Sequence, residues 1–534
     1  MEEEQASPMA RGFKDVPTQS GEEEEETRAS ERTSRGPQRD GKLKLLTTGG
    51  PSVVKGPSAG TEKPRAGTKL GTTMPGKTSP AEGVVRSTTK ETGVRGGAIS
   101  TSAPETMDDF QGAGAAFDAS QVIWFRECGC TGIEIEAVTL LRGLVARLGS
   151  ERIKTNRCEQ SCKWPAEVQQ VLNQISEDED NLFPSPNRES SSHRVVVVVH
   201  AAFLGVCGMN ENLESVLQGK AGRKGLVLVS RSMVEQDKIE EGLAEQCSRF
   251  DAVWVPSSQS QEAFLASGVA KEKIKILPEA VDTEMFNCTP QSNPFHFSLK
   301  QLEQFVHHKP QNSFTFLSMF KWEPRKNWEG LLGSFIESFP DPYTLLATPD
   351  GRQLNVSVRL LIKTQSLSWS TDPYVDIQEL LHRMKPADPT LQGRMLFIDQ
   401  VLSSSEIPPL YKVADAFVLP SHGEGWGLPI IEAMASGLPT ISTGWGGQMD
   451  FMSPENSWPV NYELVESQPG AGRWAEPDRT VLQEAMREVI VGGEAVANKV
   501  DLACEEVHRH FSIPVVTKVA LQLLESLEAV QLQA

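Results

Sequence analysis

The sequence predicts an α/β fold with two doubly wound domains, and two observations lead to this expectation. From Gln121 onward, continuous apolar runs alternate with helical segments, which is typical of parallel sheets covered on both faces. The rhythm breaks at residues 288–312, where Pro290, Pro294 and Pro310 interrupt it, and it then starts again. We therefore expect two sheets that face a cleft, with ligands bound beyond the carboxyl ends of the strands.

The first domain is read from short apolar runs and the segments between them. Residues 122–125 are expected to form a strand, residues 129–132 a turn, and residues 133–148 a helix with apolar residues three and four apart. Further strands are expected at residues 194–200, 225–229, 251–255 and 274–277.

The second domain repeats this alternation. Its strands are expected at residues 314–319, 358–362, 395–398 and 416–419. A last helical stretch at residues 515–530 has no obvious sheet partner, so we expect it to pack across the domain junction.

The amino-acid composition indicates which part of the chain is expected to fold. Of the 65 residues from Gly41 to Glu105, 35 are Gly, Ser, Thr or Pro. Such a stretch cannot bury enough apolar surface to offset the entropy of ordering it. We expect four regions: a disordered low-complexity tail at 1–115, a first Rossmann-like domain at 116–295, a second at 296–505, and a C-terminal helix at 506–534 that crosses back to the first.

Charge and cysteine usage limit the partners and the compartment. The chain has 71 acidic and 52 basic residues, a net charge of −19, which argues against nucleic acid as a partner. Its first residues show no secretory signal pattern, and its longest apolar run, residues 195–199, is too short to span a membrane. The eight scattered cysteines match no standard zinc motif and suit reduced thiols, so a cytoplasmic location is expected. The glycosylation sequons at Asn287 and Asn355 are interpreted as chance matches.

The most informative motif lies between Pro420 and Pro439, where an apolar strand leads into a helix. Gly425 and Gly427 allow close backbone approach, and the amides at a helix start can bind a diphosphate. Glu424 in the turn and Glu432 in the helix, eight residues apart, could accept hydrogen bonds from sugar hydroxyls. The alternative is a capped surface helix with two solvated glutamates.

This block resembles the hallmark of glycosyltransferase family 4, whose members are retaining, sugar-nucleotide-dependent enzymes of the GT-B fold. The motif is Glu424-x7-Glu432 within Ser-x2-Glu-Gly-Trp-Gly-Leu-Pro. Other segments are also similar to the family: residues 251–257, 267–269, 275–286, 320–326, 410–420 and 473–478. The resemblance spans about residues 120–525 and implies an acceptor-side first domain and a donor-binding second domain.

The resemblance also implies roles for single residues in donor binding. Glu432 would bind the ribose hydroxyls, Glu424 would bind a hydroxyl of the transferred sugar, and Arg325 and Lys326 would face the diphosphate. Taken without the resemblance, Arg325 and Lys326 are a solvated basic pair. Further donor-binding residues would be Gly425, Trp426, Gly427, Leu428, Gly129 and Gly132, with Val401 near the nucleotide base.

The chain departs from the family at Phe320, where the family usually carries an arginine. Lys321 could supply the missing charge, although without the bidentate geometry of a guanidinium. His200, at the end of the valine-rich strand, resembles a family histidine that reaches the reacting sugar. Its alternative is a satisfied histidine at the sheet edge. Glu235 is a candidate for acceptor contact.

The resulting expectation is a hexosyltransferase that acts with retention at the anomeric carbon. The donor would be a UDP- or GDP-linked sugar, and the acceptor a hydroxyl of a glycan, a lipid or a small molecule. The resemblance also implies no cofactor and no obligatory metal, because protein cations and helix amides would neutralise the diphosphate. Two alternatives stay open: a catalytically degenerate protein that binds a nucleotide sugar or glycan, suggested by Phe320, and an interaction scaffold, suggested by the tail.

Overall fold

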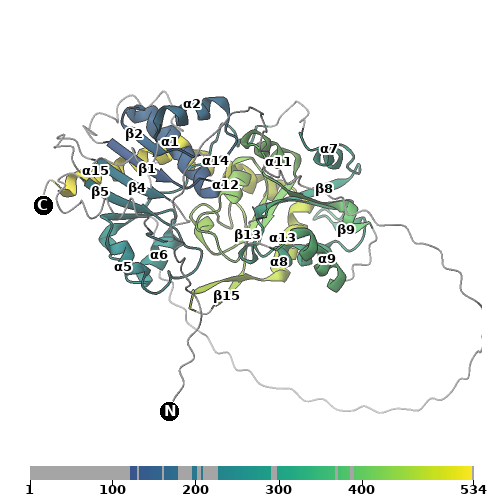
Figure 1. The fold of residues 1–534 in the computed structure, drawn as a ribbon. Helices are drawn as coiled ribbons and strands as arrows, with labels where there is room; N and C mark the ends of the chain where they lie inside the picture. Colours follow the sequence, from purple (N-terminus) through teal and green to yellow (C-terminus); the bar gives the residue numbers. More distant parts are fainter. Residues whose placement is uncertain are drawn as a thin grey trace, which may run out of the picture. The chain divides into compact units, whose positions relative to one another are not determined.

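The structure is a computed structural model. It describes residues 121–128, 131–158, 162–177, 195–200, 206–208, 226–289, 297–366, 371–384, 390–468 and 470–531. Two sheets with mainly parallel strands organise these residues (Figure 1). The α/β prediction is therefore confirmed, while the expected tail at 1–115 lies outside the described residues.

The first sheet has seven strands in the order β3-β2-β1-β4-β5-β6-β7, and all neighbouring pairs are parallel. Its strands are β1 (Gln121–Arg126), β2 (Ile153–Asn156), β3 (Ser176–Glu177), β4 (Val195–His200), β5 (Leu226–Arg231), β6 (Ala252–Val255) and β7 (Ile274–Ile276). The helices between them are α1 (Gly132–Leu148), α2 (Ala166–Ile175), α5 (Leu243–Ser248) and α6 (Ser258–Ala266).

The valine run of β4 shows why this sheet is buried on both faces. Val196 and Val198 belong to the apolar cluster with α1, whereas Val197 and Val199 belong to the cluster with α5 and α6. Successive residues of a strand point to opposite faces, so an uninterrupted apolar run fits only a sheet that is covered twice.

The second sheet has the order β11-β10-β8-β12-β13-β14, again parallel, with β9 added to β10 in antiparallel register. Its strands are β8 (Ser313–Lys321), β9 (Thr344–Ala347), β10 (Gln353–Gln365), β11 (Met395–Asp399), β12 (Ala416–Leu419), β13 (Thr440–Thr443) and β14 (Trp458–Val460). A separate antiparallel hairpin joins β15 (Tyr462–Glu466) and β16 (Arg473–Pro477).

The helices of this second half are α7 (Lys300–His307), α8 (Trp328–Ser338), α9 (Pro373–Met384), α10 (Leu391–Arg394), α11 (Ile407–Val413), α12 (Leu428–Ala435) and α13 (Arg479–Val491). They enclose one large apolar cluster with the sheet.

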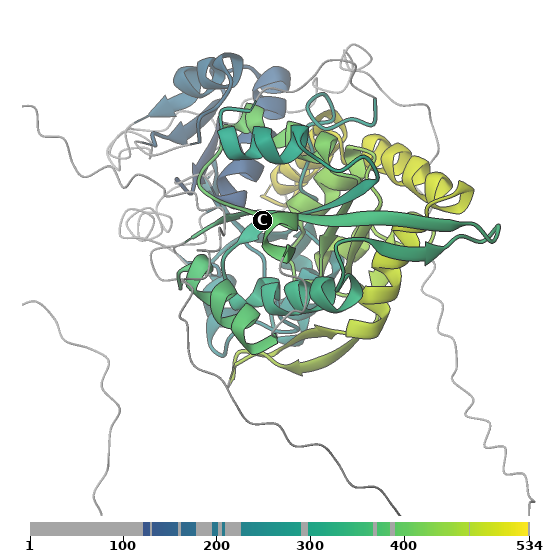
Figure 2. The same ribbon diagram turned by 90° about the vertical axis from the view of Figure 1, so that its right-hand side faces the viewer.

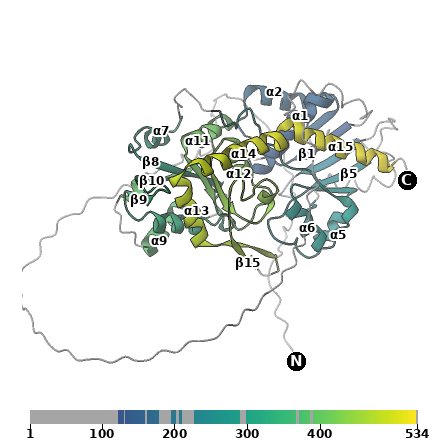
Figure 3. The same cartoon turned by 180° about the vertical axis from the view of Figure 1, so that it is seen from behind.

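Two helices follow in succession at the end of the chain, α14 (Glu494–Phe511) and α15 (Ile513–Gln531) (Figure 3). Apolar residues of α15, including Val516 and Leu524, pack into the cluster that α1 forms with the first sheet. A Cβ added to Gly143 of α1 would lie 1.9 Å from Thr517 Oγ1, so only glycine lets the two helices approach this closely. The last helix thus covers the first sheet.

The cysteines differ from the expectation of reduced thiols. Disulfides join Cys128 to Cys158, Cys207 to Cys247, and Cys288 to Cys504, and Cys162 is disulfide-bonded as well. Among the described residues no cysteine is free, so the prediction of reduced thiols is wrong for them. The sequence did not reveal this, because pairing depends on which loops meet in space.

Within the described ranges, no helix is both long and apolar enough to cross a bilayer.

Candidate active site

The candidate site is organised by the loop that joins β12 to α12. Gly427 precedes α12 with a φ of 107°, a conformation that glycine adopts without strain. A Cβ on Gly425 would lie 2.8 Å from Met233 Sδ, so this glycine admits the segment that follows β5. The first amides of a helix have no intrahelical acceptor, so the start of α12 can bind an anion.

Glu424 in this loop is buried and binds a lysine from the second half of the chain. Lys326 Nζ lies 2.8 Å from both carboxylate oxygens of Glu424. Burial acts to raise the pKa of Glu424, but Lys326 and Arg325 outweigh burial and lower it. Burial, with Arg325 nearby, lowers the pKa of Lys326. The pair is therefore enclosed, and the alternatives of a solvated glutamate and a solvated lysine do not describe it.

Arg325 sits among three carboxylates at the edge of the same site. Its Nη2 lies 2.6 Å from Glu323 Oε1 and 3.4 Å from Glu235 Oε1, and its Nη1 lies 3.4 Å from Glu424 Oε2. Burial acts to lower the pKa of Arg325, and the three carboxylates raise it. The Arg325 side chain is 18% exposed, so it remains within reach of a ligand.

Glu432 lies within α12 and is buried in a different environment. Its carboxylate accepts a hydrogen bond of 2.7 Å from the Tyr411 hydroxyl. Burial raises the pKa of Glu432 to about 7, although the bond from Tyr411 acts in the opposite direction. Because no basic residue acts on this pKa, Glu432 differs from Glu424 and retains acceptor capacity for hydroxyl groups.

Other expected donor contacts occupy different surroundings. Trp426 is 1% exposed and packs against Phe451 and Phe511, with ring centroids 5.0 and 5.4 Å away, so it serves the core. Phe320 is also buried and stacks on Trp322, so the family arginine is replaced here by a core residue. Lys321 follows it at the end of β8 and is partly exposed.

The first half of the chain reaches the same loop at several points. Ser257 Oγ donates a hydrogen bond of 2.8 Å to the Gly425 carbonyl. A Cβ on Gly423 would lie 2.2 Å from the Glu235 carbonyl oxygen, and a Cβ on Gly132 would lie 3.8 Å from Leu428 Cδ1. The structure therefore brings Gly132, Glu235 and the loop before α12 together. Gly129 lies outside the described residues.

His200 and Val401 take no part in these contacts. His200 is 2% exposed, accepts a bond of 3.3 Å from Trp124 Nε1, and has its Nε2 3.0 Å from Glu136 Oε2. The contacts of both ring nitrogens lie inside the protein, which favours the alternative of an interior histidine over one that reaches a ligand. Val401 follows β11 and is 51% exposed, so its surroundings do not identify a base site.

The sequence reading missed a buried network that includes His200. Arg231 Nη2 lies 2.6 Å from Glu136 Oε1, and Arg126 Nη1 lies 2.8 Å from Glu134 Oε1. Arg126 and Arg231 end apolar strands and both glutamates lie in the first turns of α1, a pattern that could have indicated the network.

Glu279 links this network to the candidate site. Burial raises its pKa well above the ordinary value, and repulsion from Glu136 and Glu424 adds to this effect.

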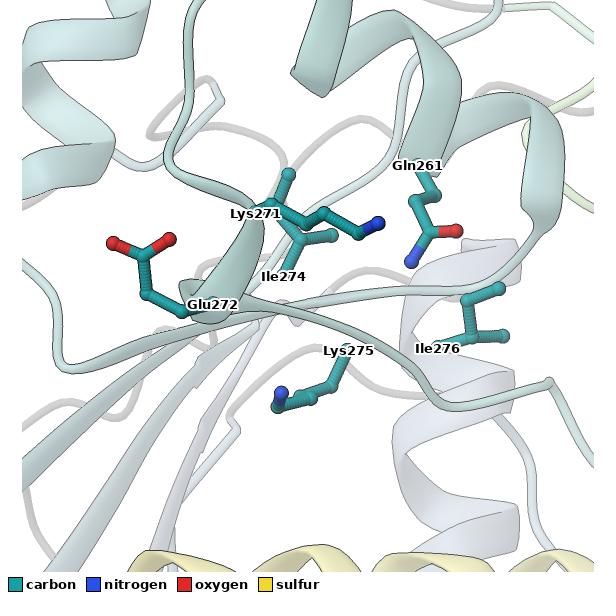
Figure 4. Close-up of a pocket in the computed structure, with 6 residues that line it drawn as sticks. All are labelled: Gln261, Lys271, Glu272, Ile274, Lys275 and Ile276. Atoms are coloured by element: carbon teal, nitrogen blue, oxygen red, sulfur yellow. The ribbon is translucent and has the colours of Figure 1, made fainter. Parts of the chain in front are cut away.

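A surface hollow of about 630 Å³ lies elsewhere, between α6 and β7 (Figure 4). Its charged side chains, Lys271, Glu272 and Lys275, are exposed and do not converge. None of the expected site residues lines this hollow, so the buried charges around Glu424 identify the candidate site instead.

Comparison with known families agrees with this location. Residues 370–469 match the family described as glycosyl transferases group 1, and this region includes Glu424 and Glu432. The chain therefore carries a glycosyl transferases group 1 domain, and the resemblance is confirmed for this part.

This chain matches curated relatives over part of their length. Mannosylfructose-phosphate synthase of Agrobacterium fabrum is 39% identical over 71 residues, which are 13% of this chain and 15% of that protein. A UDP-Gal:alpha-D-GlcNAc-diphosphoundecaprenol alpha-1,3-galactosyltransferase of Escherichia coli is 25% identical over 235 residues, or 43% of this chain and 52% of that protein.

Solved structures extend the likeness to the whole fold. HepE of Anabaena, crystallised with UDP and glucose, has a TM-score of 0.53 at 15% identity, covering 76% of this chain and 100% of that one. Sucrose-phosphate synthase of Thermosynechococcus elongatus has a TM-score of 0.50 at 16% identity, covering 77% and 100%. The two-sheet architecture is thus the GT-B fold, as expected.

Proposed function

We propose that this protein is a retaining glycosyltransferase that moves a hexose from a UDP- or GDP-linked donor to a hydroxyl acceptor. One observation carries the proposal: Lys326 and Arg325 converge on Glu424 at the start of α12, eight residues before Glu432. Cations, helix amides and two distinct carboxylates are the groups that a sugar diphosphate requires.

The pairing around Glu424 suggests how the donor would bind. In the structure Lys326 and Arg325 neutralise Glu424. A diphosphate at the start of α12 would draw these cations toward its own oxygens, and Glu424 would then be free to accept a sugar hydroxyl. Their charge would stabilise the leaving nucleotide as the bond between the anomeric carbon and the phosphate oxygen breaks.

Glu432 is suited to the other end of the donor. Its buried carboxyl has Tyr411 as partner and no cation acting on its pKa, so ribose hydroxyls could donate to it at little cost. The acceptor would approach from the first half, where Glu235 and Gly132 lie beside the loop. The identities of base, sugar and acceptor, and a reaction without a metal, belong to the same proposal.

A thermal-shift panel of nucleotide sugars tests donor binding. A donor present at about 100 times its dissociation constant should stabilise the folded protein by about 2.7 kcal/mol. Turnover is then measured with the binding donor and a set of glycan, lipid and small-molecule acceptors, and product configuration is read from the anomeric proton. The absence of a shift with every UDP- and GDP-linked sugar would refute the proposal.

Phe320 favours a second candidate, a protein that binds a nucleotide sugar without turnover. The buried ring leaves no guanidinium at this position, and Lys321 offers only a point charge. Under this alternative the thermal shift persists, but no sugar is transferred. Phe320→Arg by itself is not a suitable test of this alternative, because the substitution would bury a charged side chain against Trp322.

A further inference from the structure

The disulfides join elements that are distant in sequence, at Cα separations within the normal range. Cys128–Cys158, Cys207–Cys247 and Cys288–Cys504 span 30, 40 and 216 residues, with Cα separations of 5.5, 5.0 and 6.4 Å. Such structural disulfides form and persist in oxidising compartments and are rare where glutathione keeps thiols reduced.

Two of these disulfides lie within the first half, and one ties the segment after it to α14. Cys128 and Cys158 follow the neighbouring strands β1 and β2, and Cys207 and Cys247 are buried in the apolar cluster with α5. Cys288 lies between the two halves and is tied to α14. These positions indicate cross-links that stabilise the fold, and they count against the cytoplasmic location that reduced thiols had suggested.

A second, independent feature is the sequon Asn355-Val356-Ser357 on β10. Asn355 is exposed, and it pairs in register with Leu345 of β9, which is 63% exposed. In Figure 2 the long β10 strand and its partner β9, in teal to green, run out to a hairpin tip at the edge of the ribbon. Because the Asn355 side chain is exposed, a bulky group can be attached to it.

Exposed apolar side chains lie beside Asn355, and a glycan attached there could cover them. Side chains of directly opposed residues lie on the same face of a sheet, so Leu345 is the neighbour of Asn355 there. Tyr343, just before β9, is 50% exposed. A glycan on Asn355 would shield these apolar side chains and the adjoining strand edge from other molecules.

The other sequon, at Asn287, provides a matched contrast. The Asn287 side-chain amide donates to the Glu284 carbonyl at 3.0 Å, and its side-chain oxygen accepts from the Thr289 amide at 3.1 Å. The neighbouring Cys288 is held by Cys504, and the Asn287 carbonyl accepts from Lys412. A glycan there would compete with the native contacts of this turn.

We propose that Asn355 is an N-glycosylation site and that the chain folds in an oxidising compartment of the secretory route. The Asn355 side-chain nitrogen forms a bond to the anomeric carbon of an oligosaccharide, which leaves its lipid diphosphate carrier, and the amide releases one proton. Each disulfide forms as two thiols give up two protons and two electrons to a thiol–disulfide oxidoreductase. Asn287 stays unmodified.

The first experiment uses the full chain isolated from the cells that naturally produce it. Tryptic peptides are treated with peptide N-glycosidase in ¹⁸O water, which converts a glycosylated Asn to labelled Asp. We expect the label at Asn355 and not at Asn287. An unlabelled Asn355 peptide would overturn the proposal, as would a label confined to Asn287.

The second experiment separates the two sites and measures the thiols. The full chain, Asn355→Gln and Asn287→Gln are produced in animal cells behind a secretion signal and compared by mobility before and after deglycosylation. The wild type and Asn287→Gln should shift, whereas Asn355→Gln should not. The protein from its natural cells, denatured without reductant and treated with a thiol reagent, should carry no label at the six cysteines of these three disulfides. Label at these six positions before reduction would overturn the oxidising compartment.

Discussion

Each half of the chain contains a buried cluster of basic residues with glutamate. The two clusters serve different functions. In the first half, Arg231, Glu136 and His200 form a closed cluster whose side chains are 0 to 2% exposed. In the second half, Lys326 and Arg325 surround Glu424, and their side chains are 10 and 18% exposed.

The difference lies in whether a cluster can exchange partners. The charged side chains of the first cluster are almost fully buried beside the sheet and α1, where the buried Glu279 also acts on Glu136, so an incoming ligand has little access to them. The second lies beside the glycine loop and the start of α12, where an incoming anion could replace Glu424 as the partner of Lys326. An incoming anion therefore has access to the second cluster, which supports it as the candidate site, but not to the first.

The largest effect should come from breaking the closed cluster. Arg231→Met removes the cation that faces Glu136 and leaves this buried carboxylate beside His200 and the Glu279 carboxyl. We expect a loss of about 3 to 5 kcal/mol in the free energy of unfolding, measured by urea denaturation.

Arg473→Met provides the matched control, because Arg473 pairs with Asp237 at 2.8 Å but its side chain is 57% exposed. Its loss should stay within about 1 kcal/mol. Equal effects of the two substitutions would show that burial does not distinguish these pairs.

The second prediction concerns the exchangeable cluster. If Lys326 stabilises the leaving diphosphate, Lys326→Ala should lower kcat by about 10² to 10³ in the protein that still folds. Circular dichroism and thermal unfolding establish that the variant is folded. Lys271→Ala, in the surface hollow, removes an exposed lysine and should leave kcat unchanged. Normal turnover in folded Lys326→Ala would exclude the proposed role of Lys326.

The third prediction uses the raised pKa of Glu432, about 7 against an ordinary value of 4.5. The folded protein holds this proton where the unfolded chain releases it, so stability falls as the pH rises from about 4.5 through 7. The shift corresponds to about 3 kcal/mol.

Glu432→Gln removes this titration. Relative to the wild type, the variant should gain free energy of unfolding between pH 4.5 and pH 8, measured by urea denaturation across this range. Glu484→Gln, on an exposed position of α13, should follow the wild type at every pH. Parallel curves for Glu432→Gln and the wild type would contradict a buried, protonated Glu432.

The smallest expected effect distinguishes the two glutamates of the motif by the ligand whose binding each substitution weakens. Glu432→Gln should weaken the binding of a nucleoside diphosphate and of the nucleotide sugar alike, because both ligands contain ribose. Glu424→Gln should spare the diphosphate nucleotide and weaken binding of the intact donor by more than about tenfold, because the charge-assisted hydrogen bond of Glu424 is lost. Calorimetry with both ligands provides the measurement, and equal loss for the bare nucleotide in both variants would refute the assignment.

Much of the fold could be predicted from local patterns. The valine run of β4 and the apolar runs of β5, β8 and β12 predict buried parallel strands, since only such strands are apolar on both faces. Shorter or more polar strands, such as β2 (Ile153–Asn156) and β13 (Thr440–Thr443), were missed because four residues with threonine, lysine or serine carry little periodic signal.

The candidate site was predicted in part, as far as its chemistry follows from residue order. The spacing of Glu424 and Glu432 and the glycines between them are properties of the chain itself, so this motif is enough to recognise the loop and the helix. The environment of each glutamate does not follow from spacing. Lys326 reaches Glu424 across 98 residues, and Tyr411 reaches Glu432 from another helix.

Tertiary structure alone decided which polar groups are enclosed and which cysteines meet. His200 ends a strand near the expected ligand edge, yet its contacts with Trp124 and Glu136 turn it into part of the interior. Cys288 and Cys504 are 216 residues apart, and only the packing of α14 brings them together. The physical reason is that periodicity reports the local conformation, whereas burial, pKa and disulfide pairing depend on contacts between segments that are distant in the chain.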